Sequence, residues 1–310
     1  MLIDYTRREF GFALFSTTLA PGLPSVGMAG TKDSVRNIEH QLGSTEISGR
    51  PSRIIALEFS FVQALDSLNI GPIGISDDNE PKRVEQLLAR KIDFVSVGTR
   101  LEPNLELIST LAPDLIIADE VRHAAIYSLL SALAPTIILN SWEGDYKTIK
   151  NSVVTIAQAL GEKSEGERVI ADHGVRFAAM VARIPIDEQR RILLAVATPD
   201  NMSLHTSSSF SGSVFQAMGL TPAVESSKAI ESGAGLERLI AVNPDILFVA
   251  ADPGGTVFDQ WRDNDAWKGI SAARTGAVFE VDRNRFARFR SLKTAEMIVS
   301  EVLDNIYNPK

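Results

Sequence analysis

The side chains best suited to holding a ligand are arginines near the C-terminus of an acidic chain. Residues 283–290 hold four of them: Arg283, Arg285, Arg288 and Arg290. The 310 residues carry a formal net charge of −8, so this cluster runs against the overall composition. Guanidinium groups capture carboxylates through paired hydrogen bonds, and Arg288 and Arg290 would share one face of an extended segment. The spacing predicts an anion-binding surface there, whereas surface ion pairs are the favoured interpretation of Arg283 and Arg285.

Further candidates follow the predicted strands, because ligands of open parallel sheets bind beyond the carboxyl ends of the strands. In the first half of the chain these are Glu58, Phe59, Asp77, Asp78, Arg100, Arg122 and Trp142. In the second half they are Phe210, Asp252 and the loop 282–290. We expect Arg100 and Arg122 to converge with Arg288 and Arg290 on one anion. His205, at a strand end, is expected to be packed or to line a cleft rather than to act as a general base.

A fourteen-residue pattern occurs twice, at 104–117 and at 235–248. Each copy predicts a short amphipathic helix, a Pro-Asp turn and an apolar strand. Glu106 and Glu237 occupy the same place in the first turn of each helix. A carboxylate there complements the helix dipole, which explains either one alone. Their matched positions favour a pair of docking residues for one partner, on two similar lobes.

Strands alternate with helices through most of the chain, which predicts an α/β fold with mostly parallel sheets. Residues 145–183 are almost wholly compatible with helix, with a break at Leu160-Gly161. We therefore predict two Rossmann-like lobes joined by a long, rigid helical connection. The expected boundaries are 1–30 for a leader, 31–143 for the first lobe, 144–186 for the connection and 187–310 for the second lobe.

Composition excludes several classes of protein. The negative net charge disfavours nucleic-acid binding. The absence of cysteine excludes disulfides, thiolate metal sites and a lipid anchor on cysteine. The four histidines show no metal-ligand spacing, and no nucleophile-elbow or phosphate-loop motif occurs. We expect no catalytic residues, no cofactor and no metal held directly by the protein. The alternative, an α/β enzyme acting on a di- or tricarboxylate, would use His205 with Asp77 or Glu58.

The N-terminus predicts export. Arg7 and Arg8 precede a moderately apolar stretch that ends near a small-residue cleavage site at Gly27-Met28-Ala29. This pattern is typical of a twin-arginine signal, so we expect a soluble exported protein that is not lipid-anchored.

Several stretches together resemble the periplasmic substrate-binding proteins of iron-siderophore ABC importers, the class whose lobes are joined by a long helix (class III). The stretches that carry the resemblance are 53–61, 72–79, 97–100, 113–119, 122–124, 204–206, 212–214 and 286–290. The resemblance spans nearly all of the chain beyond the leader, and its ferric-citrate branch is the nearest.

The resemblance implies an anionic ferric siderophore, ferric citrate first, held in a cleft between the lobes. Arg100, Arg122, Arg288 and Arg290 would bind its carboxylates, and Phe210 and Phe286 would form apolar walls. Glu106 and Glu237 would meet the importer's permease, and the protein would be a periplasmic monomer. The alternatives are a ferric hydroxamate or mixed citrate–hydroxamate siderophore, or a haem or cobalamin carrier.

Overall fold

The structure is a computed structural model that describes residues 35–251 and 254–308. The predicted export signal with Arg7 and Arg8, and the candidate Asp252, lie outside the described residues. The elements named below all belong to one compact unit, residues 33–310.

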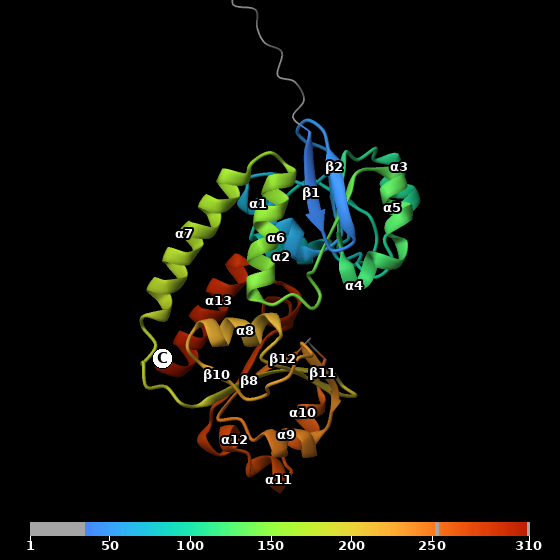
Figure 1. The fold of residues 1–310 in the computed structure, drawn as a ribbon. Coiled ribbons are helices and arrows are strands. Elements are labelled where there is room, and N and C mark those ends of the chain that lie inside the picture. Colours follow the sequence, from blue (N-terminus) through green and yellow to red (C-terminus); the bar gives the residue numbers. More distant parts are fainter. Residues whose placement is uncertain (1–34, 252–253, 309–310) are drawn as a thin grey trace, which may run out of the picture. The chain divides into compact units, whose positions relative to one another are not determined.

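The first lobe, the blue and green part at the top of Figure 1, is built on an all-parallel sheet with the spatial order β5-β4-β3-β6-β7. Its strands are β3 (Ile54–Ala56), β4 (Gly74–Ile75), β5 (Val95–Ser96), β6 (Leu115–Asp119) and β7 (Thr136–Leu139). Strands β3, β6 and β7 are buried at every position, which explains why their sequences are mostly apolar rather than alternating; the polar exceptions are Asp119 and Thr136 at strand ends. The order turns back at β3, so the carboxyl ends of β3 and β6 flank a topological switch point.

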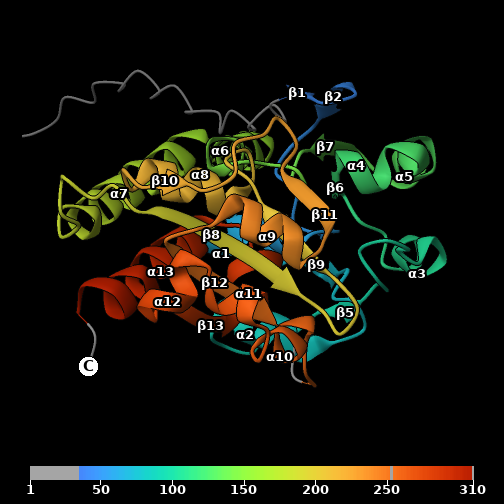
Figure 2. The same ribbon diagram turned by 90° about the horizontal axis from the view of Figure 1, so that it is seen from below.

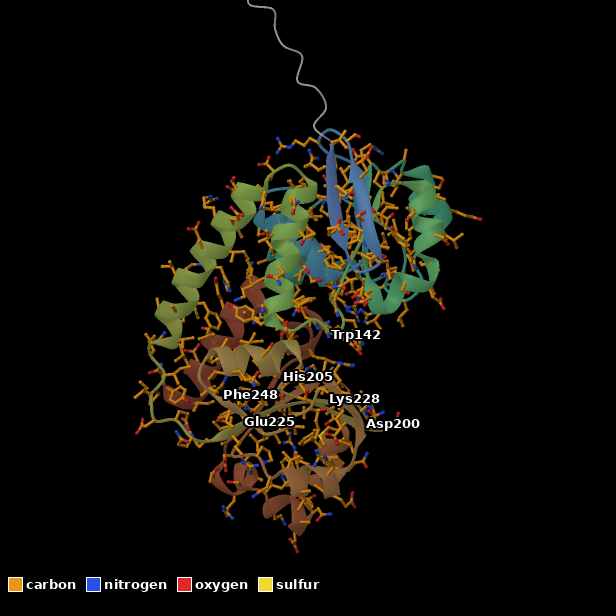
Figure 3. The ribbon with its side chains drawn as sticks, in the orientation of Figure 1. Trp142, Asp200, His205, Glu225, Lys228 and Phe248 are labelled. Carbon is orange, nitrogen blue, oxygen red and sulfur yellow. The ribbon has the colours of Figure 1, made fainter. Side chains whose placement is uncertain are left out.

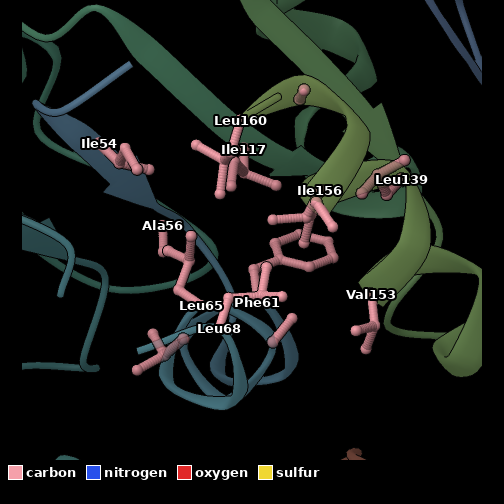
Figure 4. Packing of buried hydrophobic residues seen from close by; sticks show 14 of the residues in the cluster. Ile54, Ala56, Phe61, Leu65, Leu68, Ile117, Leu139, Val153, Ile156 and Leu160 are labelled. Atoms are coloured by element: carbon pink, nitrogen blue, oxygen red, sulfur yellow. The ribbon is translucent and has the colours of Figure 1, made fainter. Parts of the chain in front are cut away.

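Helices and a hairpin complete this lobe. The helices are α1 (Phe59–Ser67), α2 (Pro81–Leu88), α3 (Leu105–Thr110), α4 (Glu120–His123) and α5 (Tyr127–Leu133). The hairpin of β1 (Arg36–His40) and β2 (Gly43–Ile47) packs beside β7. Figure 4 shows part of the core, a buried cluster that includes Phe61 of α1, Ala56 of β3 and Ile156 of α6 (Tyr146–Ala159).

The second lobe contains a mixed sheet with the order β11-β9-β8-β12-β13, and β10 also pairs with β8. Its strands are β8 (Arg191–Ala197), β9 (Met202–His205), β10 (Thr221–Pro222), β11 (Ile230–Ala234), β12 (Ile246–Ala251) and β13 (Val278–Asp282). Its helices are α8 (Phe210–Ala217), α9 (Leu236–Val242), α10 (Val257–Trp261), α11 (Asp265–Lys268), α12 (Ser271–Thr275) and α13 (Leu292–Val302). Strand β9 runs antiparallel to β8 and β11, while β8, β12 and β13 are parallel.

Two helices connect the lobes, α6 (Tyr146–Ala159) and α7 (Lys163–Val181). The break falls at the predicted place, where Gly161 has a φ of +76° that glycine adopts readily. Helix α6 packs against α1 and α8, and α7 packs against α6 and α13. Figures 1 and 2 show α7 running along one side from the first lobe to the second. A buried hydrogen bond from Tyr146 to His173, and one between His173 and Glu296, tie α6, α7 and α13 together.

One local expectation is corrected. Asn284–Arg288 forms a π-helical turn, and the chain becomes extended only at Phe289, so Arg288 and Arg290 do not lie on one continuous strand. A close approach of backbones occurs at Gly212, which lies inside α8. A Cβ at this position would lie 1.9 Å from the carbonyl oxygen of Thr206, so only glycine allows the helix to approach that close.

Candidate functional site

A strongly basic cavity of about 490 Å³ lies where the two lobes meet. The first lobe contributes Arg100, Arg122, Trp142 and Glu143, and the second contributes Val196, Ser203, His205, Lys228, Ala229, Ile230, Ser232, Arg283, Ala287, Arg288 and Arg290. Among these described residues six carry a positive charge and one, Glu143, a negative charge. The cavity therefore suits a ligand with several negative charges.

An ionic chain forms the first-lobe side of the cavity. Asp78 accepts hydrogen bonds from Nε (3.1 Å) and Nη2 (2.7 Å) of Arg100. Nη1 of Arg100 lies 3.4 Å from Glu58, whose other oxygen accepts from Nη1 of Arg122. Burial tends to raise the pKa of Asp78, but the hydrogen bonds and charge of Arg100 outweigh it and hold that pKa below its usual value. Each nitrogen of the Arg100 guanidinium group thus already has a carboxylate partner within the protein.

Asp119 and His123 fix the positions of the arginines. Asp119 caps α4 by accepting from the amide of Arg122 (3.0 Å), and its second oxygen accepts from the amides of Ser141 and Trp142. Nδ1 of His123 accepts from the amide of Asp119, so Nε2 donates to the carbonyl of Arg100 at 2.9 Å. One carboxylate therefore places both Arg122 and Trp142, and one neutral imidazole places the backbone of Arg100.

The indole of Trp142 is shared by guanidinium groups from both lobes. The Arg122 guanidinium lies 4.1 Å from the centre of the indole, and that of Arg290 lies 5.0 Å from it. Cation–π attraction lets the ring hold two positive charges close together. In Figure 3, Trp142 lies at the edge of the first lobe, opposite His205 and Lys228 of the second.

Arg290, from the second lobe, differs from Arg100 and Arg122 because no carboxylate of the described residues forms an ion pair with it. Its side chain is almost fully buried, and its one hydrogen bond to a described residue is a long contact (3.4 Å) to the carbonyl of Arg288. Burial, opposed by Glu58 and reinforced by the charges of Arg100 and Arg122, lowers its pKa to about 10. Arg290 is still charged at neutral pH, so an incoming anion would supply the partner that the protein does not.

His205 is a neutral member of the site. Burial, reinforced by the charges of Arg290 and Arg283, lowers its pKa to about 3. Its Nδ1 is buried and has no hydrogen-bond partner among the described residues. The expectation that His205 is packed and lines the cleft is confirmed.

Three predicted phenylalanines lie in the core and not on the cavity. Phe59 is buried beneath Arg100, whose guanidinium lies 4.4 Å from its ring centre. Phe210 packs against Tyr146, and Phe286 stacks on Phe248. Phe210 and Phe286 therefore do not form the apolar walls that the family resemblance implies, because both point into the second-lobe core.

Sequence reasoning missed Lys228, which lines the cavity together with Arg283. Arg283 follows β13 directly, which is a usable signal, but Lys228 lies between two short strands and offers none. The surface interpretation is correct for Arg285, which is exposed and lies 4.0 Å from Glu301. Glu106 and Glu237 are both exposed in the first turns of α3 and α9.

The described residues contain no cluster of three His, Asp or Glu side chains that could hold a metal ion. None of their helices is both long and apolar enough to cross a membrane.

Fold and cavity together define a two-lobed binding protein, and comparison with known proteins gives its family. The chain belongs to the periplasmic binding protein family, whose model matches residues 54–284. It is 44% identical to the Fe(3+)-citrate-binding protein YfmC of Bacillus subtilis, over 91% of this chain and 89% of that protein. It is 34% identical to the Fe(3+) dicitrate-binding periplasmic protein FecB of Escherichia coli, over 86% of this chain and 88% of FecB.

Solved structures show the same fold. Staphylococcus aureus SirA complexed with staphyloferrin B superposes with a TM-score of 0.76 at 23% identity, covering 88% of this chain and 98% of SirA. The family resemblance and the predicted class III architecture are confirmed. The family consists of substrate-binding proteins rather than enzymes.

Proposed function

We propose that this protein binds an anionic ferric chelate, ferric citrate first, in the basic cavity and delivers it to an ABC importer for iron uptake. The observation that carries the proposal is the buried Arg290, whose positive charge has no ion-pair partner among the described residues. The surplus of positive charge around it suits the carboxylates of citrate. The names of YfmC and FecB, which both refer to ferric citrate, agree with this ligand.

The protein would take no cofactor and would not coordinate the iron itself, since the chelator already surrounds it. Arg122, Arg288 and Arg290 would receive the ligand's carboxylates. Trp142 would cover one side of the chelate. Arg100 would have a structural role through its contacts with Asp78 and Glu58.

The ligand is tested by titrating the purified protein with ferric citrate in a calorimeter. We expect saturable binding that weakens as salt is added, since the attraction is largely electrostatic. A neutral ferric hydroxamate is the comparison, and it should bind more weakly. An absence of heat with ferric citrate, or tighter binding of the neutral chelate, would contradict the proposal.

Glu106 and Glu237 would dock the two lobes on the importer's permease. Replacing both by Ala should leave ferric-citrate binding intact and abolish stimulation of the importer's ATPase in proteoliposomes. The matched control replaces two exposed acids outside the repeated unit, Glu102 and Glu225. Equal stimulation of the ATPase by both double variants would reject the docking role.

We further propose that the chain is exported by the twin-arginine route through Arg7 and Arg8 and works as a monomer. The sequence contains no cysteine to which a lipid could be attached. Replacing both arginines by Lys should retain the protein in the cytoplasm, which fractionation and immunoblotting would detect.

A further inference from the structure

Glu58 occupies arginine donors that an incoming anion would use. Its side chain is 1% exposed, and its two oxygens are directed to two different guanidinium groups, those of Arg100 and Arg122. Arg122 lines the cavity and has no second carboxylate within ion-pair distance among the described residues. A ligand carboxylate that reaches Arg122 therefore competes with Glu58 for it.

The carboxylate of Glu58 serves no helix cap. Glu58 is the residue that precedes α1, yet its side chain makes no capping hydrogen bond to that helix. Within the described part of the chain, its side chain hydrogen-bonds to the two arginines alone. Asp78 already holds Arg100 through two of that arginine's nitrogens, so Glu58 is not needed to anchor Arg100.

The charges around Glu58 also favour competition between Glu58 and the ligand for Arg122. Asp78 and Glu58 pair with Arg100 and Arg122, so much of the positive charge of these two arginines is already offset before a ligand arrives. The charges that act on Glu58 come from Arg100, Arg122 and Arg290, which attract it, and from Asp119, which repels it. An anion seated among these arginines would add further repulsion at short range.

We propose that Glu58 is a built-in counter-anion, which the ligand displaces from Arg122 and which then takes up a proton from solvent. This inference rests on the proposed function in one respect, that the ligand is anionic. The only bond formed is the O–H bond of the Glu58 carboxyl group. The site therefore selects for charge, because a chelate with too few negative charges cannot offset the loss of the Glu58–Arg122 pair.

Burial supports this step. It raises the pKa of the Glu58 carboxyl above its usual value even with Arg100 and Arg122 beside it. Displacing the carboxylate from Arg122 removes one of those partners and raises the pKa further. Binding should then consume protons, and affinity should rise as pH falls until Glu58 is protonated in the free protein.

The test is calorimetry with ferric citrate in two buffers of different ionisation enthalpy, which counts protons taken up on binding. Wild type should take up a measurable fraction of a proton. Glu58→Gln should take up less and should bind about tenfold more tightly, since one negative charge near the ligand is gone. The control, Glu102→Gln, makes the same change in net charge at an exposed side chain that does not line the cavity, and it should match wild type.

The outcomes separate this inference from the proposed function. Weaker binding by Glu58→Gln, or equal proton uptake by both proteins, would show Glu58 to be a scaffold and overturn the inference. Iron-free citrate is a second probe of the same arginines. In one outcome, ferric citrate fails to bind either protein while iron-free citrate binds more tightly to Glu58→Gln than to wild type. That result would support the counter-anion role of Glu58 and reject ferric citrate as the ligand. If neither probe binds either protein, both proposals fail.

Discussion

Arg100 and Arg290 have the same side chain in opposite surroundings. Arg100 donates to Asp78 and to Glu58, so its charge is balanced within the protein. Arg290 is buried with no ion pair to a described residue, and its pKa is lowered to about 10. A buried charge without a partner lowers stability but provides binding free energy when an anion arrives. The two arginines should therefore respond to mutation in opposite ways.

The first prediction compares Arg290→Ala with Arg100→Ala. Arg290→Ala should weaken ferric-citrate binding by about 30-fold or more and cost little stability, because it removes an uncompensated charge. Arg100→Ala should lower the free energy of unfolding by about 3–5 kcal/mol, because it removes the guanidinium group that pairs with both Asp78 and Glu58. Denaturant titration and calorimetry on the same samples measure both quantities. The assignment fails if Arg290→Ala is the less stable variant, or if Arg100→Ala is as stable as wild type.

Residue type and position were enough to predict much of the site. Arg100 and Arg122 follow strand ends, and the C-terminal cluster is unusual in an acidic chain, so all four predicted arginines reach the cavity. The partners of Arg100 could not be assigned, because a sequence does not say which strand-end acids face each other. Phe210 and Phe286 were misplaced for a related reason: an aromatic residue next to polar ones can point to either side, and here both join the core.

At the scale of the element, the same hydrogen bond from a backbone amide to an aspartate occurs in both copies of the repeated unit. Asp114 accepts from the amide of Arg53 (2.8 Å), and Asp245 accepts from the amide of Arg191 (2.9 Å). Each aspartate thus joins the start of the repeat's strand to the neighbouring strand, β3 or β8. The sequence showed the repeated Pro-Asp turn, but not that its aspartate binds a residue more than fifty positions earlier.

The second prediction concerns α8 and its approach to Thr206. Gly212→Ala should lower the free energy of unfolding by about 2 kcal/mol or more, because its Cβ would overlap the Thr206 carbonyl and the backbone must move. Thr206 follows His205, so ligand affinity should fall as well. Thermal and denaturant unfolding measure the first effect, and calorimetry the second.

Gly174 is the matched control for that substitution. It lies in the exposed part of α7, where an added Cβ would meet nothing within 4 Å. Gly174→Ala should raise stability by about 0.5–1 kcal/mol, since alanine restricts the unfolded chain and favours helix. Equal effects at the two glycines would show that the contact with Thr206 does not constrain α8.

At the scale of the molecule, alternating strands and helices predicted two α/β lobes and a helical connection, because periodicity is a local property. The antiparallel edge of the second sheet was not predicted, since β9 and β11 are short and carry no hairpin signal of their own. The placement of the second lobe against the first decides which basic residues meet. That is why Lys228, far from any predicted strand end, reaches the same cavity as Arg122.

The third prediction is a pH dependence of global stability that originates at the cavity. His205 has a folded-state pKa of about 3, against about 6.5 in an unfolded chain. Between pH 7.5 and 5.5 the unfolded state takes up a proton that folded His205 refuses, so its contribution to stability falls by about 1.4 kcal/mol as pH decreases. Glu58 acts in the opposite direction, because its raised pKa lets the folded state take up a proton first.

The contribution of His205 is therefore isolated by comparing wild type with His205→Gln, not from wild type alone. Nδ1 of His205 has no hydrogen-bond partner in the part of the chain that the structure describes, so Gln breaks no described contact at that atom. Over the same pH interval the variant should lose about 1.4 kcal/mol less unfolding free energy than wild type. Parallel curves of unfolding free energy against pH for the two proteins would mean that His205 takes up its proton in the folded state as well as in the unfolded chain. Its place among the arginines would then need an anion already bound, because a charged imidazole there would add one more uncompensated positive charge to the cavity.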